Sequence, residues 1–147
     1  MIKATIQPDF MPLNKVKLSV PTLPVLTLIS ISGLEEDLAK VTLPDKTIQS
    51  GGRVEPVEFE IEIPLHHTTE VAAMEAWYAT CQEPVLPGHK KVGTVSFFSQ
   101  SNLVQRTYML PGLMICGRGL PDGSLDNDGE QANNKWKMAC DEILWIA

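Results

Sequence analysis

Four acidic side chains and two glycines crowd into the nine residues DGSLDNDGE, which run from Asp122 to Glu130. Such a stretch could bind Ca²⁺, whose loops place acidic or amide ligands at positions one, three and five, glycine at six and glutamate at twelve. With Gly129 at position six, Ser124 falls at position one and Lys135 at position twelve, so the bidentate acid is missing. The flanking segments also have the pattern of strands rather than helices. We therefore predict a polar loop between two strands.

The histidines give no catalytic arrangement. His66 and His67 would point to opposite faces of a strand and could not hold one metal ion together, and His89 follows the Pro87-Gly88 pair of a turn. The chain has no G-x-S-x-G, H-E-x-x-H or phosphate-binding glycine motif. We predict no enzymatic activity, no catalytic or metal-binding residues and no cofactor. An enzyme would require the histidines to converge with a carboxylate in the fold.

Three cysteines, Cys81, Cys116 and Cys140, lie far apart and form no C-x-x-C pair that would indicate zinc or redox chemistry. Buried or unreactive thiols are the commonest fate of such residues in the cytosol. The alternative is that they form disulfides between subunits after assembly.

The composition is that of a soluble globular protein, with 44% hydrophobic and 20% charged residues. A chain of 147 residues is the size of one domain, and folding at that size removes roughly 70% of the unfolded surface from water. The net charge of −6 argues against a surface that binds phosphate backbones. No secretory signal and no membrane helix is expected, because the longest apolar run is short and contains Pro24.

The elements that position these residues begin with an N-terminal segment rich in proline, which favours extended backbone. We predict an extended arm over residues 1–23 and one domain over residues 24–147. Within the domain, Val25–Ser32 has the pattern of a strand covered on both faces, and Leu38–Leu43 that of a second strand. Pro44–Arg53 is predicted to be an exposed, mobile loop because it contains Pro44 and the Gly51-Gly52 pair.

The strictest pattern is the alternation VEFEIEI over residues 57–63. It predicts a strand with apolar side chains on one face and Glu58, Glu60 and Glu62 on the other. Because three like charges on one face repel, that face is expected to be solvated or opposed by cations. It is either a plain solvent face or an acidic functional surface.

An amphipathic helix is predicted next, over residues 68–81, with Thr68 or Thr69 as its cap. Because such a short helix is marginal alone, it is expected to lie against a sheet. Period-two patterns then predict strands over residues 92–98, over residues 103–116 with a break at Pro111-Gly112, and over residues 136–146. The fold class is mainly β (α+β), with about six strands and one helix.

The order of these elements resembles the contractile bacteriophage tail tube protein family, which is related to the haemolysin-coregulated tube protein of type VI secretion. The resemblance covers about residues 24–146. Its most specific parts are ISGLEED, a strand ending in Ser-Gly-Leu, and NLVQRTYMLPGLMICGRG, a strand with an Arg-x-Tyr-x-Leu pattern. The Gly-Gly loop, the single helix and the strand VGTVSFF stand in the order that the family has.

The resemblance implies two packed antiparallel sheets that form a β-barrel or sandwich with one flanking helix. It implies hexameric rings that stack into a tube, whose channel conducts DNA during ejection. Glu58, Glu60 and Glu62 are candidates for the channel wall, because a negative wall would not hold phosphates. The exposed loop would reach the next ring; its contact residues are Thr47, Gln49, Ser50, Gly51, Gly52 and Arg53.

The implied partners are further copies of the chain, a contractile sheath, baseplate and tail-terminator proteins, and viral DNA passing without sequence-specific binding, with no membrane. The implied location is the tail of a virion, with synthesis in the host bacterial cytoplasm. Two alternatives stay open. One is a type VI secretion tube protein; the other is a monomeric β-barrel that binds a ligand in an apolar cavity.

Overall fold

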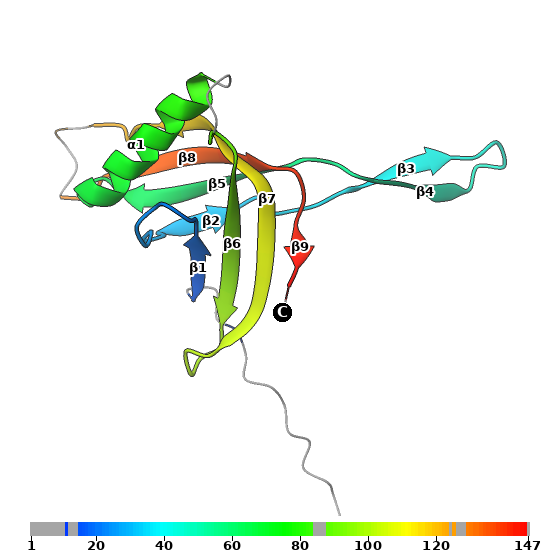
Figure 1. The fold of residues 1–147 in the computed structure, drawn as a ribbon, viewed down its shortest axis with the longest axis horizontal. Coiled ribbons are helices and arrows are strands. Elements are labelled where there is room, and N and C mark those ends of the chain that lie inside the picture. Colours follow the sequence, from blue (N-terminus) through cyan, green and yellow to red (C-terminus); the bar gives the residue numbers. More distant parts are fainter. Residues whose placement is uncertain (1–10, 12–14, 84–87, 124, 126–128, 147) are drawn as a thin grey trace, which may run out of the picture.

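The computed structural model describes residues 11, 15–83, 88–123, 125 and 129–146. In this part of the chain, one helix, α1 (Thr68–Gln82), accompanies nine strands (Figure 1). The strands are β1 (Val16–Ser19), β2 (Ser30–Ser32), β3 (Leu38–Thr42), β4 (Ile48–Val54), β5 (Val57–Pro64), β6 (Lys91–Phe98), β7 (Val104–Gly119), β8 (Asn133–Cys140) and β9 (Leu144–Trp145). The predicted fold class, mainly β with one helix, is confirmed.

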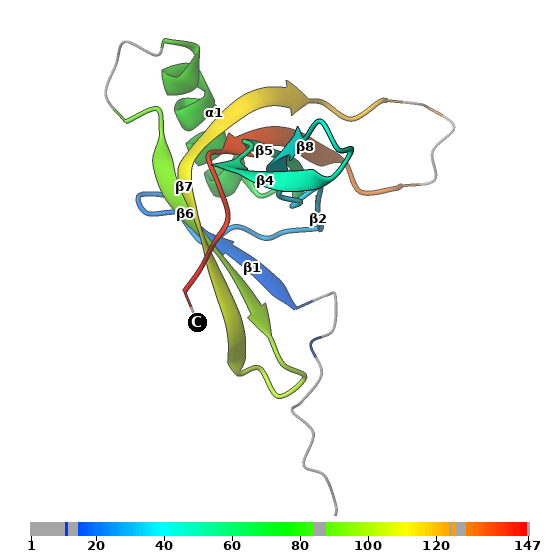
Figure 2. The same cartoon turned by 90° about the vertical axis from the view of Figure 1, so that its right-hand side faces the viewer.

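Seven strands form one antiparallel sheet in the order β1-β6-β7-β8-β5-β2, with β9 also pairing with β7. The long strand β7 is shared, because its first part pairs with β6 and β9 and its second part pairs with β8. Figure 2 shows that β7 curves from one layer into the other. We call β1, β6, β9 and the first part of β7 sheet A, and β2, β5, β8 and the second part of β7 sheet B.

The break expected at Pro111-Gly112 is wrong, because β7 runs through these residues without interruption. The strand bends there instead. Gly112 has a φ of 66°, and a Cβ atom at this position would collide with the side chain of Asp141. Glycine tolerates both the positive φ and the close approach, so the chain bends without ending the strand.

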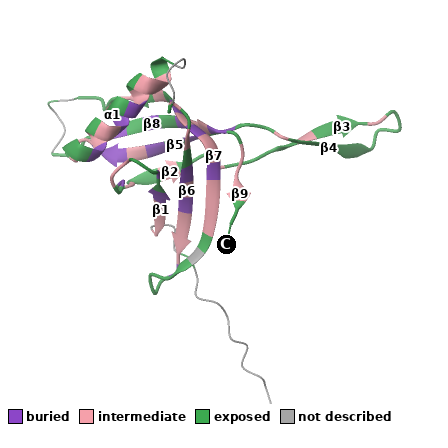
Figure 3. Cartoon of the chain, viewed as in Figure 1, coloured by how far each residue is buried: buried purple, intermediate pink, exposed green. Residues whose placement is uncertain are grey.

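Alternating side chains from both sheets meet in one core, which Figure 3 shows along β5, β6, β7 and β8. The alternation predicted for residues 57–63 is confirmed: the apolar side chains of β5 are buried and its glutamates are not. Trp136, Met138 and Cys140 of β8 are buried beside them. Because β5 pairs with β8 over its whole length, these two strands carry the centre of the core.

The predicted helix is confirmed, and it packs on the core through Met74 and Trp77, which are buried. The rings of Tyr78 and Trp136 meet edge to face with their centroids 6.1 Å apart. The predicted cap is wrong: His67 precedes the first turn, and no side chain of the described residues caps its backbone amides.

The segment Val25–Ser32 is not the doubly covered strand that its composition predicts. Only Ser30–Ser32 form a strand, β2, which pairs with β5 alone at the edge of sheet B. Val25 is 66% exposed, whereas Leu26 is buried. An edge strand has one neighbour, so its outer side stays open to solvent and its apolar residues are not all covered.

The exposed loop predicted over Pro44–Arg53 is instead largely a strand. Ile48–Val54 form β4, which pairs with β3 in a separate two-stranded sheet. Only the residues between Thr42 and Ile48 form the turn. Figure 1 shows this hairpin projecting away from the rest of the domain. We call it the β3–β4 hairpin.

The first and the last strand, β1 and β9, both belong to sheet A. The single strand expected over residues 136–146 is wrong, because it divides into β8 and β9 at Asp141, whose backbone N–H donates to Pro111 O at 2.9 Å. At the other end, β1 pairs with β6, and Leu18 is buried. Residues 1–10 and 12–14 of the predicted arm lie outside the described residues, so the arm itself stays a prediction.

Candidate assembly surfaces

The β3–β4 hairpin exposes large apolar side chains that contribute nothing to the core. Leu38, Val41 and Ile48 are 50%, 48% and 66% exposed, respectively. A single two-stranded hairpin is at best marginally stable in water. Exposed apolar groups on such an element therefore indicate a surface that another chain covers.

The tip of the hairpin is a well-defined turn. The backbone N–H of Leu43 donates to Thr47 O at 2.8 Å, and Asp45 Oδ1 accepts from the Thr47 hydroxyl at 2.6 Å and from its backbone N–H at 3.1 Å. The hydroxyl bond, followed by the backbone bond, lowers the pKa of Asp45 below its usual value. The tip therefore presents a fixed negative charge beside Lys46.

The predicted ring-contact residues all lie on this hairpin and are exposed. Thr47 belongs to the turn, whereas Gln49, Ser50, Gly51, Gly52 and Arg53 belong to β4. Gly52 has a φ of 72°, which a residue with a side chain rarely adopts. Their role in ring contacts stays a prediction, now placed on a projecting element.

The acidic face of β5 is opposed by cations. Glu60 lies opposite Lys137 and Glu62 opposite Lys135 in the register of β5 and β8. Lys135 Nζ lies 3.7 Å from Glu62 Oε1. Only Glu58 has an uncharged neighbour on β8, Ala139. The face is thus a mixed-charge surface, and its assignment to the channel wall stays a prediction.

Sheet A ends in two strands, β1 and β9, that each have one partner strand among the described residues. Figure 1 shows the four strands of this sheet side by side with these two at its outer edges. Trp145 of β9 and the next residue, Ile146, are exposed. Unpaired N–H and C=O groups along such edges are templates for pairing with another chain.

The two faces of sheet A differ in chemistry. The face toward the core carries Val16, Leu18, Val95 and Tyr108, which are neighbours in the register. The opposite face carries mainly short polar side chains in two rows across the strands, with one lysine and one methionine among them. One row is Lys17, Ser96 and Thr107, and the other is Ser19, Thr94 and Met109.

An open, mainly apolar groove of about 600 Å³ lies on the core side of sheet A. We call it the apolar groove; its lining residues are Met11, Leu34, Val95, Phe97, Arg106, Tyr108, Leu110 and Ile143. A second cavity of about 530 Å³ shares Leu34 and Phe97 with it and extends it along β2. The volume of the apolar groove falls in the range of about 300–1,000 Å³ that binding pockets have.

The three cysteines are free thiols in different surroundings. Cys140 is buried, and burial, followed by the nearby Asp141 and Glu36, raises its pKa to about 11. Cys81 is half-buried, and its Sγ donates to His89 O at 3.4 Å. Cys116 is exposed as a residue. Partial desolvation of its thiol, followed by the charge of Glu58, raises its pKa. Cys116 is therefore the thiol that a second subunit could reach; a disulfide between subunits stays a prediction.

The histidines do not lie on a strand as expected. His66 lies in the turn after β5 and His67 precedes α1, with their ring centroids 4.5 Å apart. Within the described ranges, no group of three His, Cys, Asp or Glu side chains could hold a metal ion. Ser124 and residues 126–128 of the acidic stretch lie outside those ranges; Leu125 within it is fully exposed.

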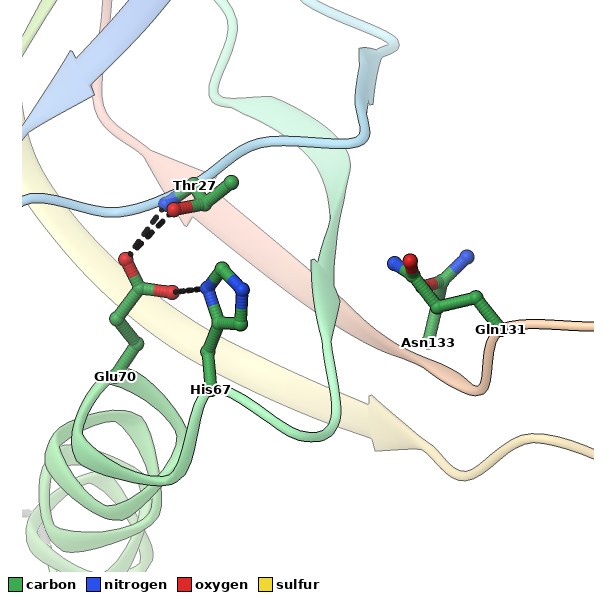
Figure 4. A network of polar contacts seen from close by, with 5 residues as sticks. All are labelled: Thr27, His67, Glu70, Gln131 and Asn133. Atoms are coloured by element: carbon green, nitrogen blue, oxygen red, sulfur yellow. Dashed lines mark hydrogen bonds and ion pairs between the residues drawn. The ribbon is translucent and has the colours of Figure 1, made fainter.

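The sequence pattern missed a polar network at the start of α1 (Figure 4). Glu70 is buried, and its Oε1 accepts from Thr27 N–H at 2.9 Å and from the Thr27 hydroxyl at 3.0 Å. His67 Nδ1 lies 2.9 Å from Glu70 Oε2. The network fastens the irregular segment before β2 to the helix. The position of Glu70 in the first helical turn predicts only a favourable interaction with the helix dipole. Nothing in the sequence indicates that Glu70 binds Thr27, which lies 43 residues away.

No protein-family model and no curated protein sequence matches this chain. Solved structures do. A chain of the sheath–tube complex of the extracellular contractile injection system PVC has a TM-score of 0.73 and 15% identity, with 93% of this chain and 91% of that chain covered. A chain of the tube-terminating cap of the anti-feeding prophage has a TM-score of 0.76 and 14% identity, with 100% and 96% covered. Hcp1 from Flavobacterium johnsoniae has a TM-score of 0.54 and 15% identity, with 92% and 94% covered.

The first of these neighbours comes from a sheath–tube complex and the second from a tube-terminating cap. At 14–15% identity they define the fold of this chain, which is that of tube proteins of contractile injection systems. The predicted resemblance is thereby confirmed at the level of the fold. In the described part of the chain, no helix is long and apolar enough to cross a membrane.

Proposed function

We propose that the chain is a structural subunit of the tube of a contractile injection machine. The observation that carries the proposal, besides the shared fold, is that sheet A has two open edges, β1 and β9, in the part of the chain that the structure describes. A sheet with one open edge can only form a pair of copies. A sheet with two can be extended from copy to copy until a ring closes.

In the proposed ring, β1 of one copy pairs with the β9 edge of the next, so that the contact is head to tail. Such contacts form a closed ring when the rotation between copies divides a full turn. The resemblance to tail tube proteins supports hexameric rings. Trp145 and Ile146, which are exposed in the single chain, would be covered at this contact.

The channel wall in this ring is the face of sheet A opposite the core. The rest of the domain covers most of the core side of the sheet and leaves the apolar groove open there. The mainly short polar side chains of the other face would therefore line the hole. Such a wall offers few fixed charges to hold a passing DNA or protein cargo. Glu58, Glu60 and Glu62 lie on sheet B, and this arrangement would place them toward the sheath instead.

Rings would stack through the β3–β4 hairpin. Its projection beyond the domain and its exposed apolar side chains support a contact with the neighbouring ring. The sheath would surround the tube, and baseplate and terminator proteins would contact its ends. In a phage this tube would conduct DNA as part of the virion tail, after synthesis in the host cytoplasm. In a secretion system it would be the Hcp-like projectile.

A second candidate function is a cap that ends the tube. The anti-feeding prophage cap covers 100% of this chain at a TM-score of 0.76, against 93% and 0.73 for the PVC sheath–tube chain. A cap would form one ring and stack on one side only. A tube subunit would form rings that stack on both sides.

Sedimentation of the purified protein over a range of concentrations tests the ring. We expect a species of roughly six times 16.2 kDa, the mass of one chain. Ile146→Lys should shift the protein toward a single-chain species, because an edge lysine opposes strand pairing. Leu120→Lys, at an exposed position after β7, is the matched control and should assemble normally. If the protein sediments as a single chain at every concentration, the ring is contradicted.

A further inference from the structure

The apolar groove is open because sheet A extends beyond the part of sheet B that covers it. Its floor is aromatic: the rings of Phe97 and Tyr108 meet edge to face with centroids 6.2 Å apart. At its rim, the guanidinium of Arg106 lies 5.6 Å from the ring centroid of Trp145. No carboxylate of the described residues forms an ion pair with Arg106. Glu35 lines the adjoining cavity, which shares Leu34 and Phe97 with the groove.

The tip of the β3–β4 hairpin carries the complementary groups. Ile48 supplies an exposed apolar side chain on one face of the hairpin and Val41 one on the opposite face, because Ile48 pairs with Thr42 and Val41 with Gln49. Asp45 and Lys46 supply one charge of each sign at the turn. The hydrogen bonds of Asp45 with Thr47 fix the turn before any contact forms. A preformed tip loses little conformational entropy when it binds.

The hairpin cannot fill the groove of its own chain, because it projects away from sheet A (Figure 1). A projection on one part of the molecule and a groove on another define a head-to-tail contact between copies. When head-to-tail contacts do not close into a ring, they can add copies without limit. Growth of a tube along its axis requires such a contact.

We propose that the β3–β4 hairpin tip of one copy inserts into the apolar groove of a second copy, with Ile48 over the aromatic floor and Asp45 beside Arg106. In the same pose Lys46 lies toward Glu35. The proposal rests on the proposed tube function and adds the receptor to which the hairpin binds.

Charge reversal tests the contact. Asp45→Arg and Arg106→Asp should each lower the fraction of protein in sedimenting assemblies by about tenfold, as expected for one charge contact that becomes repulsive. The double variant should restore assembly in part, because Asp45→Arg also removes the hydrogen bonds with Thr47 that fix the turn. Asp122→Arg, at an exposed acid after β7, is the matched control: combined with Arg106→Asp it should not restore assembly. Normal assembly of both single variants would overturn the proposal.

Because Arg106→Asp also removes the contact with Trp145, a second measurement does not depend on it. In a Cys116→Ser background, copies with Ile48→Cys are mixed with copies with Leu34→Cys and treated with a short bismaleimide. We expect crosslinked dimers for this pair and none when Leu120→Cys replaces Leu34→Cys.

The outcomes separate the two proposals. Assemblies that form normally without the crosslink would overturn the hairpin contact and leave the tube subunit standing. If a Cys at position 10 of the N-terminal segment crosslinks to Leu34→Cys in place of Ile48→Cys, the groove belongs to that segment, and the proposal also falls. A protein that forms no assemblies contradicts both.

Discussion

Glu70 shows how a single carboxylate holds an irregular segment in place. It accepts both hydrogen bonds that Thr27 donates and contacts His67 with its other oxygen. The segment before β2 has no strand pairing over most of its length, so these bonds replace the ladder that it lacks.

Glu70→Ala should therefore lower the free energy of unfolding by about 1.5–3 kcal/mol, because two part-buried hydrogen bonds to a charged acceptor are lost. Glu75→Ala on the same helix is the control. Glu75 forms its ion pair with Arg118 at the surface, and its loss should cost less than about 1 kcal/mol. Urea denaturation measures both; equal losses would show that the Thr27 network adds nothing.

Cys140 makes stability depend on alkaline pH. Burial raises its folded-state pKa from 9.0 to about 11, so the unfolded chain releases the thiol proton at lower pH than the folded chain does. The stabilisation is complete below pH 9 and is lost as the pH rises toward 11.

The expected loss over this window is about 2–3 kcal/mol in the free energy of unfolding. Lysines and tyrosines also titrate there, so the measurement compares the pH slopes of the wild type and Cys140→Ala. The variant should have the shallower slope. Identical slopes would mean that the thiol does not carry the effect.

At the level of the elements, the sequence predicts well where one face of a strand or helix is buried. The alternation of residues 57–63 located β5, and the helical pattern after His67 located α1 within a residue of its end. In both, the period of the apolar side chains matches the geometry of the element.

The pattern fails where an element has no core to face. β4 contains Gly51 and Gly52, which indicate a turn, and all but one of its residues are exposed, so no alternation marks it. Backbone pairing with β3, rather than burial of one face, holds β4 in the strand conformation. Likewise, Pro111 does not end β7, because β7 changes partners there from β6 to β8 and needs a bend at that point. The candidate assembly surfaces could not be predicted from the sequence, because they depend on which strands pair and which strands lie at the edge of a sheet.

The hairpin should be separable from the stability of the domain. Val41→Ser with Ile48→Ser removes its exposed apolar groups, which lie outside the core. We expect the free energy of unfolding to change by less than about 0.5 kcal/mol, while sedimenting assemblies are lost. Val92→Ser, at an exposed apolar position of β6, should leave assembly intact. A large drop in stability for the hairpin variant would mean that it packs on its own domain.

At the scale of the whole molecule, the chain keeps its contacts for other copies. Its described residues form one core, a sheet with two open edges, a projecting hairpin and an open groove. A protein that worked alone would be expected to cover such edges. A subunit of a continuous tube leaves them open because neighbours cover them.

Cryo-electron microscopy of the assembled protein tests this account most directly. We predict stacked hexameric rings with a central hole, in which β1 of each copy continues into the β9 edge of the next. A single ring with the same strand pairing would indicate a cap. Rings or filaments in which sheet A keeps both edges open would contradict the account.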